Sequence, residues 1–345
     1  MLAVKDNMPR KTHMQQYVSR GKEARHDSVL MQEVLEALVV EPGDTLVDAT
    51  IGGAGHFAAF LAALGEGGVI VGIDADRAAV ERGREAYAED RRHERPIAHL
   101  VNDNFRNLTR ILERLGIGPV NKIFFDLGWS GYQIAAPRGF SFQNDEPLLM
   151  TYGEEGPSAG LGTGETAADI VNSSSEEALA DLIFTYGEER FARSIARSIV
   201  AVRSRGRILT TGALVAAILA GTPAWYHDRK IHPATKTFQA LRIAVNDEIG
   251  ALREGLTAAI DALAPLGRLA IISFHSIEDR VVKNALRDAA LAGLGSLSPK
   301  KPIVPGRPEI LANRRARSAK LRVFERAAVA RAEQASSITP ILSYV

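Results

Sequence analysis

The sequence has 345 residues, of which 46% are hydrophobic and 24% are charged, and its formal net charge at pH 7 is +1. This length and composition predict a globular chain with one large domain or two ordinary ones. The absence of cysteine excludes disulfide bonds, thiolate metal sites and catalysis by a cysteine nucleophile. No apolar run approaches the roughly 20 residues of a membrane span, and no signal peptide is recognisable, so we expect a cytoplasmic protein.

The near-neutral net charge conceals a basic N-terminus. Residues 1–25 contain six cations against two carboxylates, namely Lys5, Arg10, Lys11, Arg20, Lys22 and Arg25 against Asp6 and Glu23. Such a segment is usually solvated and less often a phosphate-binding arm. We therefore expect residues 1–25 to form a flexible basic extension.

From residue 26 to residue 128, helical and extended patterns alternate, which predicts a mostly parallel sheet with helices on both faces. The expected strands are Thr45 to Ala49, Gly68 to Asp74, Ile97 to Val101 and Lys122 to Leu127. The expected helices are Val29 to Val39, His56 to Leu64, Arg77 to Glu89 and Phe105 to Leu115.

A glycine-rich stretch between residues 128 and 164 interrupts this alternation. Residues 166–220 then have a helical period, and a long helix from Thr237 to Leu263 leads to a further strand from Arg268 to Phe274. We therefore predict an α/β fold in which a helical insertion, residues 136–231, interrupts one sheet domain formed by residues 26–135 and 232–345.

The segment after the first strand has the features of a nucleotide site. Glycines at 52, 53 and 55 allow the backbone to turn tightly beside a helix N-terminus, and the second strand ends at Asp74, twenty-one residues after Gly53. An acidic side chain there can accept hydrogen bonds from both ribose hydroxyls of an adenosine. Because Gly53-Ala-Gly-His-Phe-Ala58 also fits the dinucleotide fingerprint, this region alone leaves an NAD-linked enzyme open.

The third and fourth strands bring further polar groups to the same edge of the sheet. Phe105 follows the third strand and either stacks on an adenine or packs in the core, and Asp126 ends the fourth. We expect Asp126 to hold a polar group of the cofactor or to accept a hydrogen bond from a reacting amine.

Six motifs, in order from His26 to about Arg326, resemble the MraW family, also called ribosomal RNA small-subunit methyltransferase H. They are Asp48-Ala-Thr-Ile-Gly-Gly-Ala-Gly-His56, Asp126-Leu-Gly-Trp-Ser130, Arg138-Gly-Phe-Ser-Phe142, Tyr186-Gly-Glu-Glu-Arg190, His232-Pro-Ala-Thr-Lys-Thr-Phe-Gln-Ala-Leu-Arg-Ile-Ala-Val-Asn246 and Ile272-Ser-Phe-His-Ser-Ile-Glu-Asp-Arg280. A further match, Ala316-Arg-Ser-Ala-Lys-Leu-Arg322, ends the similar region.

The resemblance implies a class I, Rossmann-like methyltransferase sheet with an inserted helical domain that helps to bind RNA. It implies S-adenosylmethionine as methyl donor, and the N4 amine of a cytidine in small-subunit ribosomal RNA, free or in the assembled subunit, as acceptor. By position, it implies a cofactor pocket lined by Ala54, Gly55, His56, Asp74, Phe105, Asp126 and Gln133. We take Asp126 as the candidate catalytic residue and expect no metal site.

The loop after the fourth strand departs from the family pattern. Gly131 replaces a second serine, and Leu148-Leu-Met-Thr-Tyr152 replaces a run that usually carries an aspartate and an arginine. We expect these changes to concern RNA contacts more than the cofactor site. We expect Trp129 to form one face of a pocket for an unstacked base, and His275 to serve in proton removal, in RNA contact or in structure.

Two basic segments are candidate RNA surfaces. Arg190, Arg193 and Arg197 are spaced to share one helical face, with Ile195, Ile199 and Val202 opposite and Arg203, Arg205 and Arg207 following. The second segment contains Arg314, Arg315, Arg317 and Lys320. Both are either solvated faces or phosphate contacts.

The alternatives to an RNA methyltransferase are an NAD-linked oxidoreductase, a methyltransferase of small molecules or proteins, and a non-catalytic RNA-binding assembly protein. The sequence is compatible with either a monomer or a homodimer, and residues 1–25 lie outside the region that resembles the family.

Overall fold

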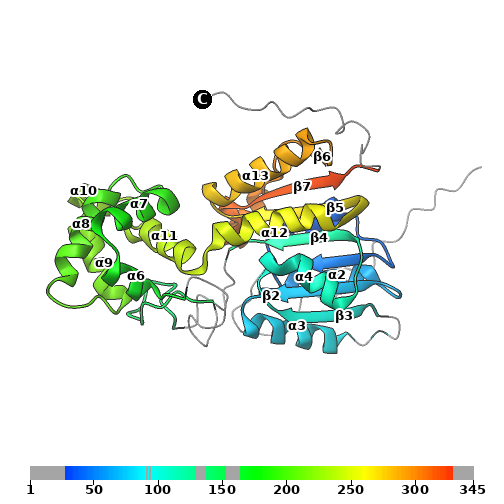
Figure 1. Ribbon diagram of the computed structural model, residues 1–345, viewed down its shortest axis with the longest axis horizontal. Coiled ribbons are helices and arrows are strands. Elements are labelled where there is room, and N and C mark those ends of the chain that lie inside the picture. The colour runs from blue at the N-terminus through cyan, green and yellow to red at the C-terminus, as the bar shows by residue number, and fades with distance from the viewer. Residues whose placement is uncertain (1–27, 91, 93–94, 129–136, 153–163, 329–345) are drawn as a thin grey trace, which may run out of the picture.

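A computed structural model describes residues 28–90, 92, 95–128, 137–152 and 164–328 (Figure 1). The first half of the chain alternates helices and strands: α1 (Met31–Leu38), β1 (Thr45–Asp48), α2 (Gly55–Leu64), β2 (Val69–Asp74), α3 (Arg77–Glu89), β3 (Ile97–Asn102), the 3₁₀ turn η2 (Phe105–Asn107), α4 (Leu108–Leu115) and β4 (Val120–Asp126). All four predicted βα units are therefore present, with boundaries within a few residues of those expected. The helix predicted from Phe105 begins as a 3₁₀ turn.

Seven strands form one sheet in the order β3-β2-β1-β4-β5-β7-β6. The strands β5 (Leu263–Ser273), β6 (Gly295–Leu297) and β7 (Lys320–Arg326) complete it. The pairs among the first five strands are parallel, and β7 is antiparallel to both of its neighbours. The predicted α/β fold with a Rossmann-like sheet is confirmed. Because β1 lies between β2 and β4, the strand order reverses beside β1, where open α/β sheets bind their ligands.

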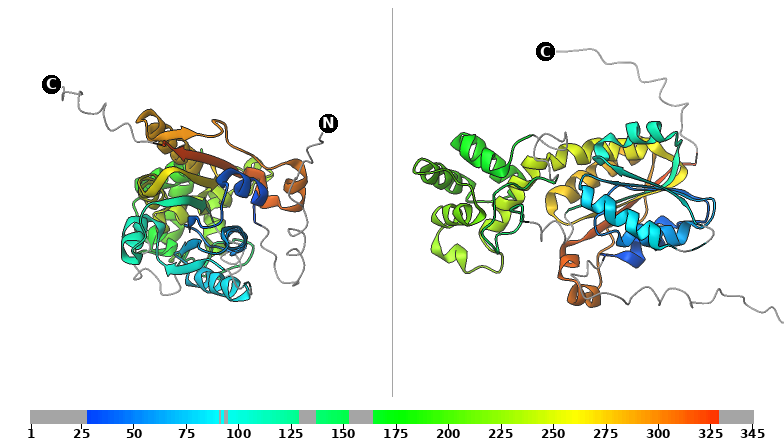
Figure 2. Two further views of the ribbon diagram at one scale, coloured as in Figure 1. Left: turned by 90° about the vertical axis from the view of Figure 1, so that its right-hand side faces the viewer. Right: turned by 90° about the horizontal axis from the view of Figure 1, so that it is seen from below.

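Helices cover both faces of the sheet, as the views in Figure 2 show. Alternate residues of each strand point to opposite faces. Phe125 and Ile271 belong to a core shared with α4, α12 (Glu248–Ala262) and α13 (Ser276–Leu291). Their neighbours Phe124 and Ile272 belong to a second core shared with α1 and α2. Each side chain at the end of a strand is thereby directed to one face or the other.

The chain leaves the sheet after β4 and forms a helical cluster at one end of the molecule (Figure 1). Its helices are α6 (Ala167–Ser173), α7 (Glu176–Gly187), α8 (Ala192–Arg203), α9 (Thr211–Ala220), α10 (Ala224–His227) and α11 (Ala234–Asn246). They enclose a separate apolar core that includes Phe140, Ile195 and Leu214, together with Phe238 and Leu241 of α11. The division of the chain into domains at residues 136 and 231 stays a prediction. Although α11 follows residue 231, it packs in the core of the helical cluster.

The single long helix expected from Thr237 to Leu263 is wrong. Asp247 has a left-handed conformation, with φ 46° and ψ 44°, and it separates α11 from α12. Asn246 fixes this break, because its amide donates to Met150 O at 2.8 Å and its Oδ1 accepts from Tyr152 N at 3.1 Å. The helix therefore ends where it meets a segment almost a hundred residues away in the sequence.

The C-terminal part of the sheet was only partly expected from the sequence. The strand predicted from Arg268 begins earlier, at Leu263, and β6 and β7 were not predicted. Between β6 and β7 lie α14 (Arg307–Ala312) and the 3₁₀ turn η4 (Arg314–Ser318). Among the described residues, no helix combines the length and the apolar composition required to cross a membrane.

Candidate active site

Three carboxylates end three neighbouring strands. Asp48, Asp74 and Asp126 are the last residues of β1, β2 and β4, so they lie at one edge of the sheet. Asp48 is completely buried, and its Oδ2 atom has no hydrogen-bond partner among the described residues. The Oδ1 atom of Asp126 is likewise buried and has no hydrogen-bond partner among the described residues. Buried carboxylate oxygens without donors are costly, which indicates that this edge is shaped to receive a ligand.

The predicted glycine-rich turn leads from β1 into α2. Gly52 and Ala54 have left-handed conformations, with φ 52° and 62°. Gly55 begins α2, and a Cβ atom there would lie 2.1 Å from Ser28 Oγ. No side chain caps the N-terminus of α2 among the described residues, so its backbone N–H groups face the sheet edge.

Asp74 is oriented by the backbone around it. Its two carboxylate oxygens accept hydrogen bonds of 2.8 Å from Gly52 N and from Asp76 N. Burial raises the pKa of Asp74 to about 6, although both backbone donors oppose this rise. Each oxygen can accept a further hydrogen bond, so the arrangement suits the vicinal hydroxyls of a ribose.

His56 lies in the first turn of α2 and contacts Asp126. Its Nε2 atom is 3.1 Å from Val29 O, and its Nδ1 atom is 3.6 Å from Asp126 Oδ2. The ring is buried and packs against Phe124, with ring centroids 4.6 Å apart. Asp126 N donates to Thr50 Oγ1 at 2.6 Å, so the turn after β1 fixes the backbone of Asp126, while His56 of α2 contacts its carboxylate.

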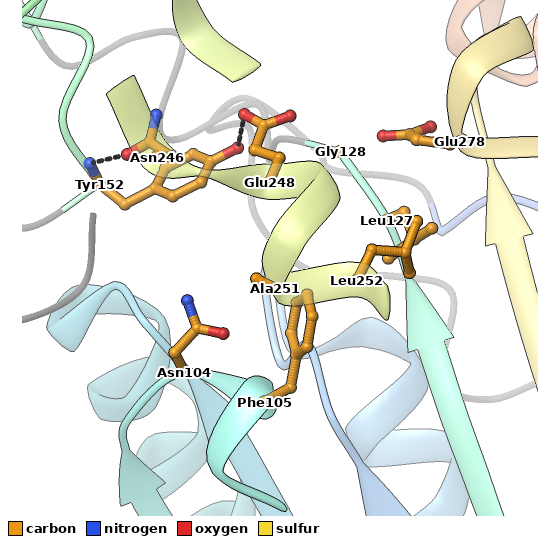
Figure 3. Close-up of a pocket in the computed structure, with 10 residues that line it drawn as sticks. All are labelled: Asn104, Phe105, Leu127, Gly128, Tyr152, Asn246, Glu248, Ala251, Leu252 and Glu278. Carbon is orange, nitrogen blue, oxygen red and sulfur yellow. Dashed lines mark hydrogen bonds between the residues drawn. The ribbon is translucent and has the colours of Figure 1, made fainter. Parts of the chain in front are cut away.

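A pocket opens on the other face of the sheet, beyond the ends of β3 and β4 (Figure 3). Phe105 forms part of its wall and meets Phe125 edge-on, with centroids 5.3 Å apart. The Phe105 ring also packs closely on α12, because a Cβ atom at Gly255 would lie 2.6 Å from its Cδ2. The pocket is lined by Asn104, Phe105, Leu127, Gly128, Tyr152, Asn246, Glu248, Ala251, Leu252 and Glu278.

Charged groups from the helical cluster reach this pocket. Glu248 accepts from Tyr152 Oη and from Arg242 Nη2, both at 2.7 Å (Figure 3 shows the first bond). Burial and the neighbouring Glu248 carboxylate raise the pKa of Tyr152 well above its ordinary value. The Arg242 guanidinium is buried, and the nearby anions hold its pKa above the usual value despite that burial. The pair joins α11 to α12 at the edge of the sheet.

Glu248, His275 and Glu278 lie close enough to suggest a metal site, with ligand atoms within 4.8 Å of one another. The hydrogen bonds favour another interpretation. His275 Nδ1 accepts from Glu278 N at 3.3 Å, so the proton of a neutral ring lies on Nε2, which is 3.0 Å from Glu278 Oε1. Nε2 therefore has no lone pair for a cation, and His275 caps α13 instead.

The structure brings some of the predicted residues together and separates others. Ala54, Gly55, His56, Asp74 and Asp126 surround the ends of β1, β2 and β4, whereas Phe105 lines the pocket on the α12 face. Gln133 and Trp129 lie outside the described residues. The roles assigned to these residues stay predictions.

Sequence reasoning missed several residues of the site. Asp48 was noted only as part of a motif, although it ends an apolar strand just as Asp126 does. The pairing of Arg242 and Glu248 with Tyr152 had no local signal, because Tyr152 is distant in the sequence.

The predicted basic stripe lies partly on α8. Arg193 and Arg197 are exposed there, opposite the buried Ile195 and Ile199, but Arg190 precedes the helix. Some of these cations already have partners within the protein: Arg197 is 3.4 Å from Glu176, and Arg203 donates to Val171 O. In the second basic segment, Lys320 pairs with Asp279 at 2.8 Å, whereas Arg314 and Arg317 are exposed.

Comparison with known proteins identifies relatives over most of the chain. A sequence model of the MraW methylase family matches residues 23–327. Ribosomal RNA small subunit methyltransferase H of Deinococcus radiodurans is 46% identical over 306 residues, covering 88% of this chain and 90% of that protein. Proteins of the same name from Brevibacillus brevis and Syntrophotalea carbinolica are 41% and 43% identical, covering 87% and 88% of this chain and 98% of each relative.

Proposed function

Because the chain belongs to the MraW methylase family, we propose that it transfers a methyl group from S-adenosylmethionine to the N4 amine of a cytidine in small-subunit ribosomal RNA. The relatives that carry the methyltransferase name align with 88% and 87% of this chain. The observation that carries the proposal is the row of three buried or half-buried carboxylates at the switch point of the sheet. The relatives' names do not favour an NAD-linked oxidoreductase or a non-catalytic assembly protein.

The residues at the sheet edge fit a positively charged adenosine cofactor. Asp48 Oδ2 and Asp126 Oδ1 are buried without hydrogen-bond partners among the described residues, so a nearby cation would compensate them. Asp74 would bind the ribose hydroxyls, and Phe105 would contact the adenine. Ala54, Gly55 and His56 would line the remainder of the cofactor site, and we also assign Gln133 to it by its position in the motif.

The reaction requires the target amine to be aligned and desolvated. The cytosine N4 lone pair is delocalised into the ring, so its nucleophilicity rises when an acceptor binds an N–H group as the nitrogen becomes pyramidal. S-adenosylmethionine supplies the methyl group on a positively charged sulfur. Asp126 is the last residue of β4, three residues before Trp129 in the sequence, and its Oδ1 atom has no hydrogen-bond partner among the described residues. We therefore assign Asp126 as the acceptor for the amine.

The proposed function is tested with labelled S-adenosylmethionine and small ribosomal subunits from cells that lack this enzyme. Nucleoside analysis of the RNA is expected to show N4-methylcytidine. Parallel reactions with deproteinised RNA would distinguish an assembled subunit from free RNA as the substrate. Cofactor binding without transfer to either substrate would contradict the proposed acceptor.

The surface of the helical cluster supports an RNA partner through an exposed tryptophan. Trp225 in α10 is 56% exposed, and the Arg190 guanidinium lies over its ring, 4.7 Å from the centroid. Phe191 and Tyr226 also contact this arginine, so the indole is held in place. Within the described ranges, neither Arg190 nor the exposed Arg229 forms an ion pair with a carboxylate. A fixed ring beside unpaired cations suits an unpaired base and its phosphate.

Replacing Trp225 with alanine is expected to weaken binding of the ribosomal RNA by about 1–3 kcal/mol, the typical contribution of one stacked base. Phe184 provides the matched control, because it is 65% exposed on α7 and no ring or cation contact involves it in the described part of the chain. Trp225→Phe should retain most of the affinity. Equal losses in Trp225→Ala and Phe184→Ala, measured by titration at fixed salt, would contradict a specific stacking site.

A further inference from the structure

The hydrogen bonds of His56 determine where its protons lie. Val29 O is a carbonyl oxygen and can only accept, so His56 Nε2, 3.1 Å away, must carry a hydrogen. In a neutral ring, Nδ1 is then a lone pair, and it lies 3.6 Å from the carboxylate atom Asp126 Oδ2. Two acceptors facing each other at this distance repel. The contact becomes favourable when one proton lies between them, on Nδ1 or on the carboxylate.

The surroundings of Asp48, next to His56, favour retention of a proton on that carboxyl. Asp48 is completely buried, and that burial raises the pKa of Asp48 to about 7, although His56 acts in the opposite direction. Asp126 and Asp74 add further negative charge near Asp48. Arg315, from η4, is the cation that faces Asp126, and burial lowers its pKa despite the Asp126 charge. A second guanidinium, that of Arg82, donates to Gly52 O and acts on Asp74, so two arginines face three carboxylates at this edge.

We propose that Asp48, His56 and Asp126 together hold a proton that they release when the positively charged cofactor binds, and that they retain when its uncharged thioether product binds. This inference rests on the proposed function, because it requires the cofactor to lie beside these carboxylates. The reason is electrostatic: a cation brought next to a buried, proton-holding group weakens that group's hold on its proton. S-adenosylmethionine carries the sulfonium charge, whereas S-adenosylhomocysteine does not.

Release of this proton on cofactor binding would leave the three side chains ready to accept the proton that the amine must lose. With the cofactor bound, Asp126 Oδ2 and His56 Nδ1 are free of the shared proton and can accept one. The methylated amine gives up one N–H proton, which passes to Asp126 and is held against His56 Nδ1. The electron pair of that N–H bond stays on nitrogen, so the product base is neutral. The three side chains thus return to the protonated state in which they began.

The experiment is calorimetric titration of the protein with each ligand in several buffers that differ in ionisation enthalpy. With S-adenosylmethionine, the observed heat is expected to vary with the buffer and to report release of up to about one proton near pH 7. With S-adenosylhomocysteine, the heat corrected for the ligand's own ionisation should not vary. As the pH is raised towards about 7, affinity for S-adenosylmethionine should increase by up to about tenfold per pH unit, and above about pH 7 it should level off. The reason is that the proton held by the three side chains must leave before the cofactor binds.

Two variants assign the effect to these residues. Asp48→Asn removes one titrating carboxyl, and His56→Gln keeps a donor for Val29 O but cannot hold the proton facing Asp126. Both are expected to reduce the proton release, with circular dichroism confirming that each is folded. Equal proton release by the two ligands, or cofactor binding with none, would overturn the inference and leave the proposed function intact. Failure of the wild-type protein to bind S-adenosylmethionine would overturn the cofactor site itself.

Discussion

Replacing Asp126 with alanine is expected to lower the rate of methyl transfer by about 10²- to 10⁴-fold, the usual contribution of a positioned acceptor or proton-transfer group. We expect this loss because one carboxylate oxygen of Asp126 is available to the amine and the other contacts His56. The backbone hydrogen bond from Asp126 N to Thr50 does not involve the side chain, so the strand should keep its place. Single-turnover assays with saturating cofactor and ribosomal subunits would measure the effect.

Asp126→Asn is the matched control for this change. The amide keeps an acceptor oxygen and almost the same volume, but it cannot take up a proton. We therefore expect its rate to lie between those of the wild type and the alanine variant. A wild-type rate in Asp126→Ala, with cofactor affinity unchanged, would contradict the assignment of Asp126 to the reaction.

The sheet edge could be predicted from the sequence because its signals are local. Each of β1, β2 and β4 is a short apolar run that ends in an aspartate, and parallel strands bring their carboxyl ends to one edge. The glycine-rich turn after β1 likewise needs only neighbouring residues. Asp74 was therefore placed at the edge correctly, while its hydrogen bonds to Gly52 and Asp76 required the fold.

Features that depend on distant contacts could not be predicted. The period of residues 237–263 is helical throughout, and the break at Asp247 arises because Asn246 binds the backbone of Met150 and Tyr152. Likewise, the position of β7 depends on its antiparallel pairing with β5 and β6, and no turn motif beside Lys320–Arg326 indicates this position. His275 illustrates the same limit, because its capping role appears only with the Glu278 hydrogen bonds.

The pair formed by Arg242 and Glu248 gives the largest expected effect on stability. The Arg242 side chain is 5% exposed and that of Glu248 is 12% exposed, with Nε and Oε1 2.7 Å apart. Removing one member of a buried pair leaves the other charge desolvated, which typically costs about 3–5 kcal/mol. We expect Arg242→Met to lower the free energy of unfolding by that amount, measured by denaturant titration. Tyr152 Oη would still donate to Glu248 but would carry no compensating charge.

Two further variants show whether burial of the pair causes this loss. Arg287 donates to Asp288 on the surface, where the side chains are 56% and 64% exposed, so Arg287→Met should change the stability by at most about 0.5 kcal/mol. The double variant Arg242→Met, Glu248→Gln removes both charges and should recover only part of the loss, because Glu248 is then uncharged but the buried Glu278 still lacks the Arg242 charge. An Arg242→Met effect as small as that of Arg287→Met would show that solvent reaches Glu248. In that case the junction between α11 and α12 would be held by the Asn246 hydrogen bonds rather than by charge.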